Sequence, residues 1–75
     1  GRGYTVQYAA AESEGEARRL LLRLKGSPAG ARVVPTTRDG QTLYRVVSGP
    51  YATRAAADEV GRASGASYWI YTGAP

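Results

Sequence analysis

The sequence predicts an α+β domain in which two helices cover one face of a four-stranded antiparallel sheet. Four short segments are rich in β-branched and aromatic residues, as strands are, and two others repeat apolar residues at helical spacing. Their order along the 75 residues is β-α-β-β-α-β, the split βαβ arrangement of ferredoxin-like and RNP-like folds. A chain of this length forms one small domain with little core to spare.

The first part of the chain predicts a strand and a helix. Residues 4–8 alternate with period two and combine tyrosine, threonine and valine, which favours a strand. Ser13 is a suitable N-cap for the helix that follows. The apolar residues that recur at helical spacing are Ala17, Leu20, Leu21 and Leu24. Gly26 and Pro28 then indicate the end of the helix.

The middle of the chain predicts a β-hairpin. Residues 31–36 favour a strand, and Pro35 restricts it to a sheet edge or to the end of the strand. Asp39-Gly40 is typical of a tight hairpin turn, and residues 42–48 favour the next strand. We expect Gly49-Pro50 to end that strand.

The last part of the chain predicts a second helix and a fourth strand. Thr53 is a suitable N-cap for a helix that reaches about Ser64, and Gly65 can close it in the left-handed conformation. Residues 67–72 favour a strand, with Trp69 and Ile70 at its centre.

The parity of the strands predicts which side chains face away from the helices. If Val6, Val46 and Ile70 point towards the helices, their neighbours point towards the uncovered face of the sheet, here called the open face. These neighbours are Thr5, Gln7, Leu43, Arg45, Val47, Trp69 and Tyr71. A shift of one residue in the last strand would instead place Trp69 in the core.

The charged residues separate along the same lines. The chain carries a net charge of +4, and all six acidic residues fall in predicted helices, in the residues leading into them or in the hairpin turn. The predicted strands carry only Arg32 and Arg45. An open face that lacks carboxylates suits a sugar or a nucleobase better than a metal ion.

The amino acids that are missing exclude several classes of function. The chain has no cysteine and no histidine, which excludes a thiol nucleophile, an imidazole base and the usual zinc sites. No nucleophile–base pair is visible, so we expect no enzyme, no catalytic residue, no metal and no cofactor. No apolar run approaches the ~20 residues of a membrane span. We therefore expect no membrane insertion by this segment, and any anchor or targeting signal would lie outside it.

Three segments together resemble the SPOR domain, the sporulation-related repeat of bacterial cell-division proteins and cell-wall hydrolases. They are Tyr-x-Val-Gln at residues 4–7, Ala-x-x-Leu at residues 17–20, and Tyr-Arg-Val-Val-Ser-Gly-Pro-Tyr at residues 44–51. The resemblance extends from Tyr4 to Thr72. It implies a single domain over residues 1–75, ordered from about 4 to 72, that was excised from a longer envelope protein.

The resemblance also implies a function. SPOR domains are non-catalytic modules whose open sheet face binds peptidoglycan glycan strands lacking stem peptides, and which direct their parent protein to the division septum in the periplasm or cell envelope. Gln7 and Arg45 match ligand-face positions of the family. Two positions depart from it: a frequent serine is Ala10 here, and a position that is sometimes aromatic is Leu43. Trp69 could supply the stacking that Leu43 lacks.

We therefore expect a monomeric glycan-binding domain, with denuded peptidoglycan strands as its partner and no nucleic-acid ligand. The expected glycan-binding residues are Gln7, Arg45, Trp69, Tyr71, Leu43 and Thr5. Aromatic rings stack on the C–H-rich faces of sugars, and amide and guanidinium groups donate to sugar oxygens.

Two other functions and one structural role stay open. Sheets of this topology also bind single-stranded nucleic acid, although residues 43–47 lack the aromatic RNP1 sequence. A protein-interaction module that uses an exposed strand edge is a further alternative. Arg45 could also serve only to pair with an acidic residue of a helix or turn.

Overall fold

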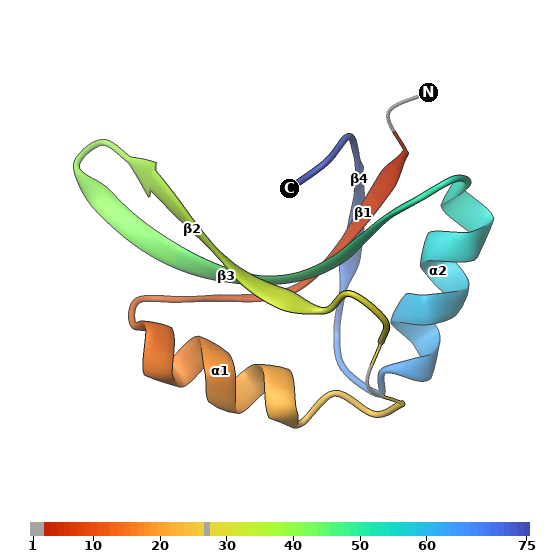
Figure 1. Ribbon diagram of the computed structural model, residues 1–75, viewed down its shortest axis with the longest axis horizontal. Helices are drawn as coiled ribbons and strands as arrows, with labels where there is room; N and C mark the ends of the chain where they lie inside the picture. The colour runs from red at the N-terminus through yellow and green to blue at the C-terminus, as the bar shows by residue number, and fades with distance from the viewer. Residues whose placement is uncertain (1–2, 27) are drawn as a thin grey trace.

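The six predicted elements are all present, in the predicted order (Figure 1). The computed structural model describes residues 3–26 and 28–75. The elements are β1 (Tyr4–Ala11), α1 (Glu14–Leu22), β2 (Arg32–Arg38), β3 (Gln41–Tyr51), α2 (Arg54–Ala63) and β4 (Trp69–Thr72). The predicted α+β class and βαββαβ order are therefore confirmed.

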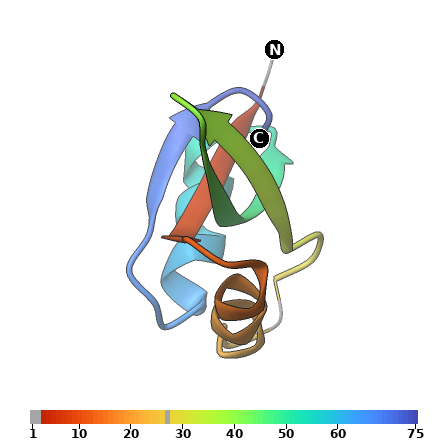
Figure 2. The same cartoon turned by 90° about the vertical axis from the view of Figure 1, so that its left-hand side faces the viewer.

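The four strands form one antiparallel sheet in the order β2-β3-β1-β4. The two central strands, β1 and β3, pair with each other, while β2 and β4 form the edges. Helix α1 packs against β1, β2 and β3, and α2 packs against β1, β3 and β4. The two helices thus contact different parts of the same strongly twisted sheet, with α1 below the strands and α2 to their right in Figure 1 and behind them in Figure 2. Neither helix covers the open face, although Thr5 and Val47, which the register places on it, are fully buried.

The core between the helices and the sheet is built from small residues. Its buried apolar side chains include Val6, Ala11, Ala17, Leu24, Val46 and Ala57. Tyrosines extend it: Tyr8 and Tyr44 pack against the core while remaining partly exposed. The hydroxyls of Tyr8 and Ser48 lie 2.7 Å apart, and Tyr51 donates to the Ser48 hydroxyl at 3.0 Å. Tyrosine can therefore fill a thin core because its hydroxyl finds a partner there.

The two predicted N-caps and the predicted hairpin turn are confirmed. The Ser13 hydroxyl accepts a hydrogen bond from the Glu16 backbone N–H at 3.2 Å, and the Thr53 hydroxyl accepts one from Ala56 at 3.0 Å. In the hairpin turn, Asp39-Gly40 has the positive φ angles of 52° and 77° that such a turn requires. These features depend on neighbouring residues, which explains why the sequence predicts them well.

The prediction that Gly49-Pro50 ends β3 is wrong, because the strand continues to Tyr51. A shift in register between β1 and β3 accommodates the extra residue, with Tyr4 opposite Tyr51 and Val6 opposite Ser48. Gly49 has a φ of 106°, and a Cβ there would lie 3.0 Å from the Tyr4 carbonyl oxygen. Glycine is thus the residue that lets the strand bend here and still pair.

Further boundaries differ from the prediction. Helix α1 already ends at Leu22, before the predicted stop at Gly26 and Pro28, and β4 begins at Trp69 rather than at residue 67. Strand β1 extends past Tyr8 to Ala11 through a second register shift, between Gln7 and Ala9, that breaks the alternation of the sequence. Pro35 lies inside β2 rather than at its end, and β2 is an edge strand, as the proline requires.

Candidate ligand-binding face

Residues predicted for the open face lie on it in neighbouring strands. Gln7 of β1 lies between Val47 of β3 and Trp69 of β4. Tyr71 lies opposite Thr5, two residues further along β4. Because paired residues of adjacent strands share a face, this register places the side chains together on the side away from the helices.

Arg45 donates hydrogen bonds to side chains of the three other strands. Its Nε donates to the Thr36 hydroxyl of β2 at 2.8 Å. Its Nη1 donates to Gln7 Oε1 at 3.1 Å and to the Tyr71 hydroxyl at 2.8 Å. The guanidinium carbon also lies 5.9 Å from the centre of the Tyr71 ring. One side chain of β3 thus connects all four strands, since its partners belong to β2, β1 and β4.

Among the described residues, the side-chain hydrogen bonds of Arg45 go to neutral groups and not to an acidic residue. In the part of the chain that the structure describes, its side-chain partners are two hydroxyls and one amide. The two ion pairs found among those residues, Arg18–Glu14 and Arg62–Asp58, each join neighbouring turns of one helix. The positive charge of Arg45 is therefore held in place by neutral groups.

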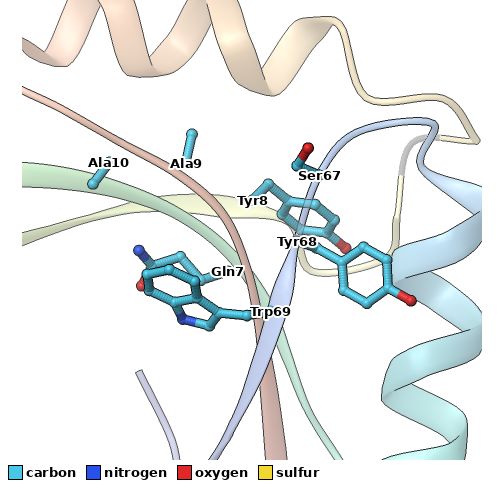
Figure 3. Close-up of a pocket in the computed structure, with 7 residues that line it drawn as sticks. All are labelled: Gln7, Tyr8, Ala9, Ala10, Ser67, Tyr68 and Trp69. Carbon is cyan, nitrogen blue, oxygen red and sulfur yellow. The ribbon is translucent and has the colours of Figure 1, made fainter.

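Trp69 lies on the open face and not in the core. Its side chain is 64% exposed, although it stands at the start of a paired strand. Tyr68 points to the other side of β4, towards α2, and donates to the Asp58 carboxylate. Figure 3 shows the two neighbouring rings on opposite sides of the strand, with the indole over Gln7. The indole is therefore available for stacking.

A hollow of about 250 Å³ opens beside the indole. The pairing of β1 with β4 ends at Gln7 and Trp69, while β1 continues to Ala11, so β4 leaves the edge of β1 uncovered here. The residues that line the hollow are Gln7, Tyr8, Ala9, Ala10, Ser67, Tyr68 and Trp69 (Figure 3). The exposed indole, the Gln7 amide and a shallow apolar floor thus adjoin one another.

Two predicted site residues contribute less than expected. Thr5 belongs to the open face by register, but it is fully buried, and its hydroxyl donates to the Gly73 carbonyl at 2.5 Å. The backbone N–H of Gly73 also donates to the Gly3 carbonyl at 2.8 Å, so the segment after β4 lies against the start of β1. Leu43 is half-buried opposite Thr36 and offers only an apolar contact. We therefore do not retain Thr5 as a ligand contact.

The sequence did not single out Thr36, although it anchors the Arg45 guanidinium. Once the hairpin turn is placed at Asp39-Gly40, Thr36 must pair with Leu43 and share its face, so the register of the hairpin could have found it. Ala10 lies opposite Arg45. Ala10, which stands where the family frequently has a serine, therefore lies directly beside Arg45.

The described residues offer hydrogen-bond donors and aromatic rings on this face. They include no group of three or more acidic side chains that could hold a metal ion. None of their helices is long and apolar enough to cross a membrane. Arg32 stands on the same face as Arg45, where its Nη1 donates to the Gly49 carbonyl at 3.0 Å. A face with arginines, an amide and exposed rings can hold a polar ligand that also offers an apolar surface.

The fold and this face define a small α+β binding module. The SPOR domain family matches residues 1–63, and the chain therefore belongs to that family. SPOR domains are non-catalytic modules that generally bind peptidoglycan and act at the cell envelope. No curated protein and no solved structure matches the chain. The matched residues include Gln7 and Arg45 but end before β4, which carries Trp69 and Tyr71.

Proposed function

We propose that the open face binds peptidoglycan glycan strands that lack stem peptides, and that this binding directs a longer envelope protein to the division septum. The observation that carries the proposal is the arrangement of the exposed Trp69 ring beside the Arg45–Gln7–Tyr71 cluster. We assign contacts to Gln7, Arg45, Trp69 and Tyr71, with Leu43 as an apolar neighbour.

A glycan suits this arrangement for physical reasons. A pyranose ring presents C–H groups to an aromatic face and oxygen atoms around its rim, so it needs a platform and donors at one site. Trp69 and Gln7 are direct neighbours across the β1–β4 pair and supply both.

Binding to sacculi with and without stem peptides tests the ligand. An amidase that removes the stem peptides should increase the amount of domain bound per unit of glycan. A muramidase that then digests the strands should release the domain. Equal binding before and after the amidase step would contradict the preference for denuded strands, and binding that survives glycan digestion would contradict a glycan ligand altogether.

Two further measurements separate this proposal from its alternatives. A fluorescent fusion exported to the periplasm should gather at division sites, whereas uniform labelling of the envelope would contradict septal targeting. A nucleic-acid module would instead bind single-stranded oligonucleotides with an affinity that falls steeply with salt. Such binding in preference to glycan would replace the present proposal.

A further inference from the structure

Arg45 dictates the direction of the hydrogen bonds around it. A guanidinium group has five N–H donors and no acceptor. Gln7 must therefore present its carbonyl oxygen, Oε1, to Arg45 Nη1, and Tyr71 must accept through its hydroxyl oxygen. This polarity follows from the chemistry of arginine alone and does not depend on where hydrogen atoms are placed.

The ends of these groups that face the ligand are consequently donors. With its oxygen turned to Arg45, the Gln7 amide presents its NH₂ group outward, and the Tyr71 hydroxyl proton is left for another acceptor. Arg45 Nη2 and Gln7 Nε2 have no acceptor among residues 3–26 and 28–75. Three donor groups from β1, β3 and β4 are thus gathered around the Arg45 guanidinium group.

The cluster also keeps its positive charge. Arg45 has no carboxylate partner in the described part of the chain, and its side chain is half-buried, so water screens it less than an exposed arginine. The hydrogen bonds to Thr36, Gln7 and Tyr71 hold the guanidinium group in one position. A guanidinium group that is fixed in position and surrounded by hydrogen-bond donors favours an anion, because an anion such as a carboxylate only accepts hydrogen bonds.

From this polarity we infer that Arg45, Gln7 and Tyr71 read a free carboxylate on the sugar chain, which is the group that a stem peptide would occupy. The inference rests on the proposed function. A carboxylate offers acceptors to all three donors and neutralises Arg45. When a stem peptide is attached, that carboxylate becomes an amide, which carries no charge and has an N–H donor in place of one acceptor oxygen. The cluster would thus distinguish denuded strands by their chemistry.

Chemical reduction of the carboxylates tests the inference on the ligand. Denuded glycan strands are compared with the same strands after carbodiimide activation and borohydride reduction, which convert each carboxylate into a primary alcohol. Trp69 is the single tryptophan and adjoins the site, so its fluorescence reports binding. We expect reduction to weaken binding by about tenfold or more, as loss of a charged hydrogen bond does.

The outcomes separate this inference from the proposed function. Equal affinity for native and reduced strands would overturn the carboxylate inference and leave glycan binding intact. Failure of the native strands to bind would overturn the proposed function itself.

A reversal of polarity tests the inference on the protein. Gln7→Glu keeps the size of the side chain but replaces the outward NH₂ group by a carboxylate oxygen and neutralises Arg45. We expect binding to fall by about tenfold or more while the melting temperature stays the same or rises, because the new carboxylate can pair with Arg45. Wild-type affinity in this variant would contradict the inference.

Gln41→Glu is the matched control. Gln41 is exposed at the hairpin end of β3, where its Nε2 lies 3.4 Å from Glu12 Oε2, and it takes no part in the cluster. The same chemical change there should leave affinity within about twofold of wild type. A loss equal to that of Gln7→Glu would show that overall charge, and not the cluster, governs binding.

Discussion

Two large apolar side chains, Trp69 and Leu22, are left exposed by the domain. Leu22 ends α1 and is 85% exposed, whereas Trp69 is 64% exposed on the open face. Isolated exposed apolar residues are common on protein surfaces, so exposure alone says little about function. Trp69 differs from Leu22 because it lies beside Gln7, which is hydrogen-bonded to Arg45.

Replacement of Trp69 by alanine should weaken glycan binding roughly threefold to tenfold, the effect of losing one aromatic stacking contact. The melting temperature should change little, because most of the ring is already in water. Leu22→Ala removes a more exposed side chain from the helix layer and should leave affinity unchanged. Calorimetric titration of both variants with denuded glycan checks this, and equal losses would show that Trp69 has no special role.

At the scale of elements, the contact of α2 with β4 depends on a helical glycine. Gly61 is buried inside α2, and a Cβ there would clash with the Tyr68 ring. Tyr68 precedes β4, and its hydroxyl reaches back to the Asp58 carboxylate at 2.5 Å. Glycine has a low helical propensity, but at position 61 it leaves room for the Tyr68 ring, which packs on α2 and holds the edge strand β4 in place.

Gly61→Ala should destabilise the domain by about 1–3 kcal/mol, the usual cost of forcing extra volume into a packed site. Gly15→Ala is the control, because a Cβ there meets only the flexible end of Arg19, 3.7 Å away. That change should leave stability unchanged or raise it by up to about 1 kcal/mol, since alanine favours a helix. Urea unfolding of the two variants measures the difference, and equal stability would contradict the packing argument.

At the scale of the whole molecule, the composition sets how stability responds to pH. Without histidine and cysteine, no side chain has an ordinary pKa between about 5 and 9. The hydrogen bond from Tyr68, aided by Arg62, lowers the pKa of Asp58 below 3.8. The same hydrogen bond raises the pKa of Tyr68 above 10.0, and burial raises that of Tyr8. The folded state is thus favoured over a broad neutral range.

The melting temperature should accordingly stay constant from about pH 5 to 9. A lowered Asp58 pKa contributes stability that is present above pH 3.8 and is lost as the pH falls through the lowered value. A raised Tyr68 pKa contributes stability that is present below pH 10.0 and is lost as the pH rises through the raised value. Tyr68→Phe keeps the ring but should reduce both slopes in thermal scans. Unchanged slopes would show that this pair does not couple folding to pH.

The sequence predicted the elements well because their signals are local. Ser13 and Thr53 cap the helices within three residues, and Asp39-Gly40 makes its own turn. The predictions failed where a distant strand overrides a local signal. Gly49-Pro50 resembles a strand end, yet pairing with β1, more than forty residues earlier in the chain, carries β3 through it.

The sequence by itself determined the order of the elements and the residues that share the open face, because both follow from periods of two and 3.6 residues. Only the tertiary structure decided how those residues work together. Gln7 and Arg45 are 38 residues apart, and Arg45 and Tyr71 are 26 apart. Their hydrogen bonds, the burial of Thr5 and the exposure of Trp69 arise from the register between strands, which no local stretch of sequence encodes.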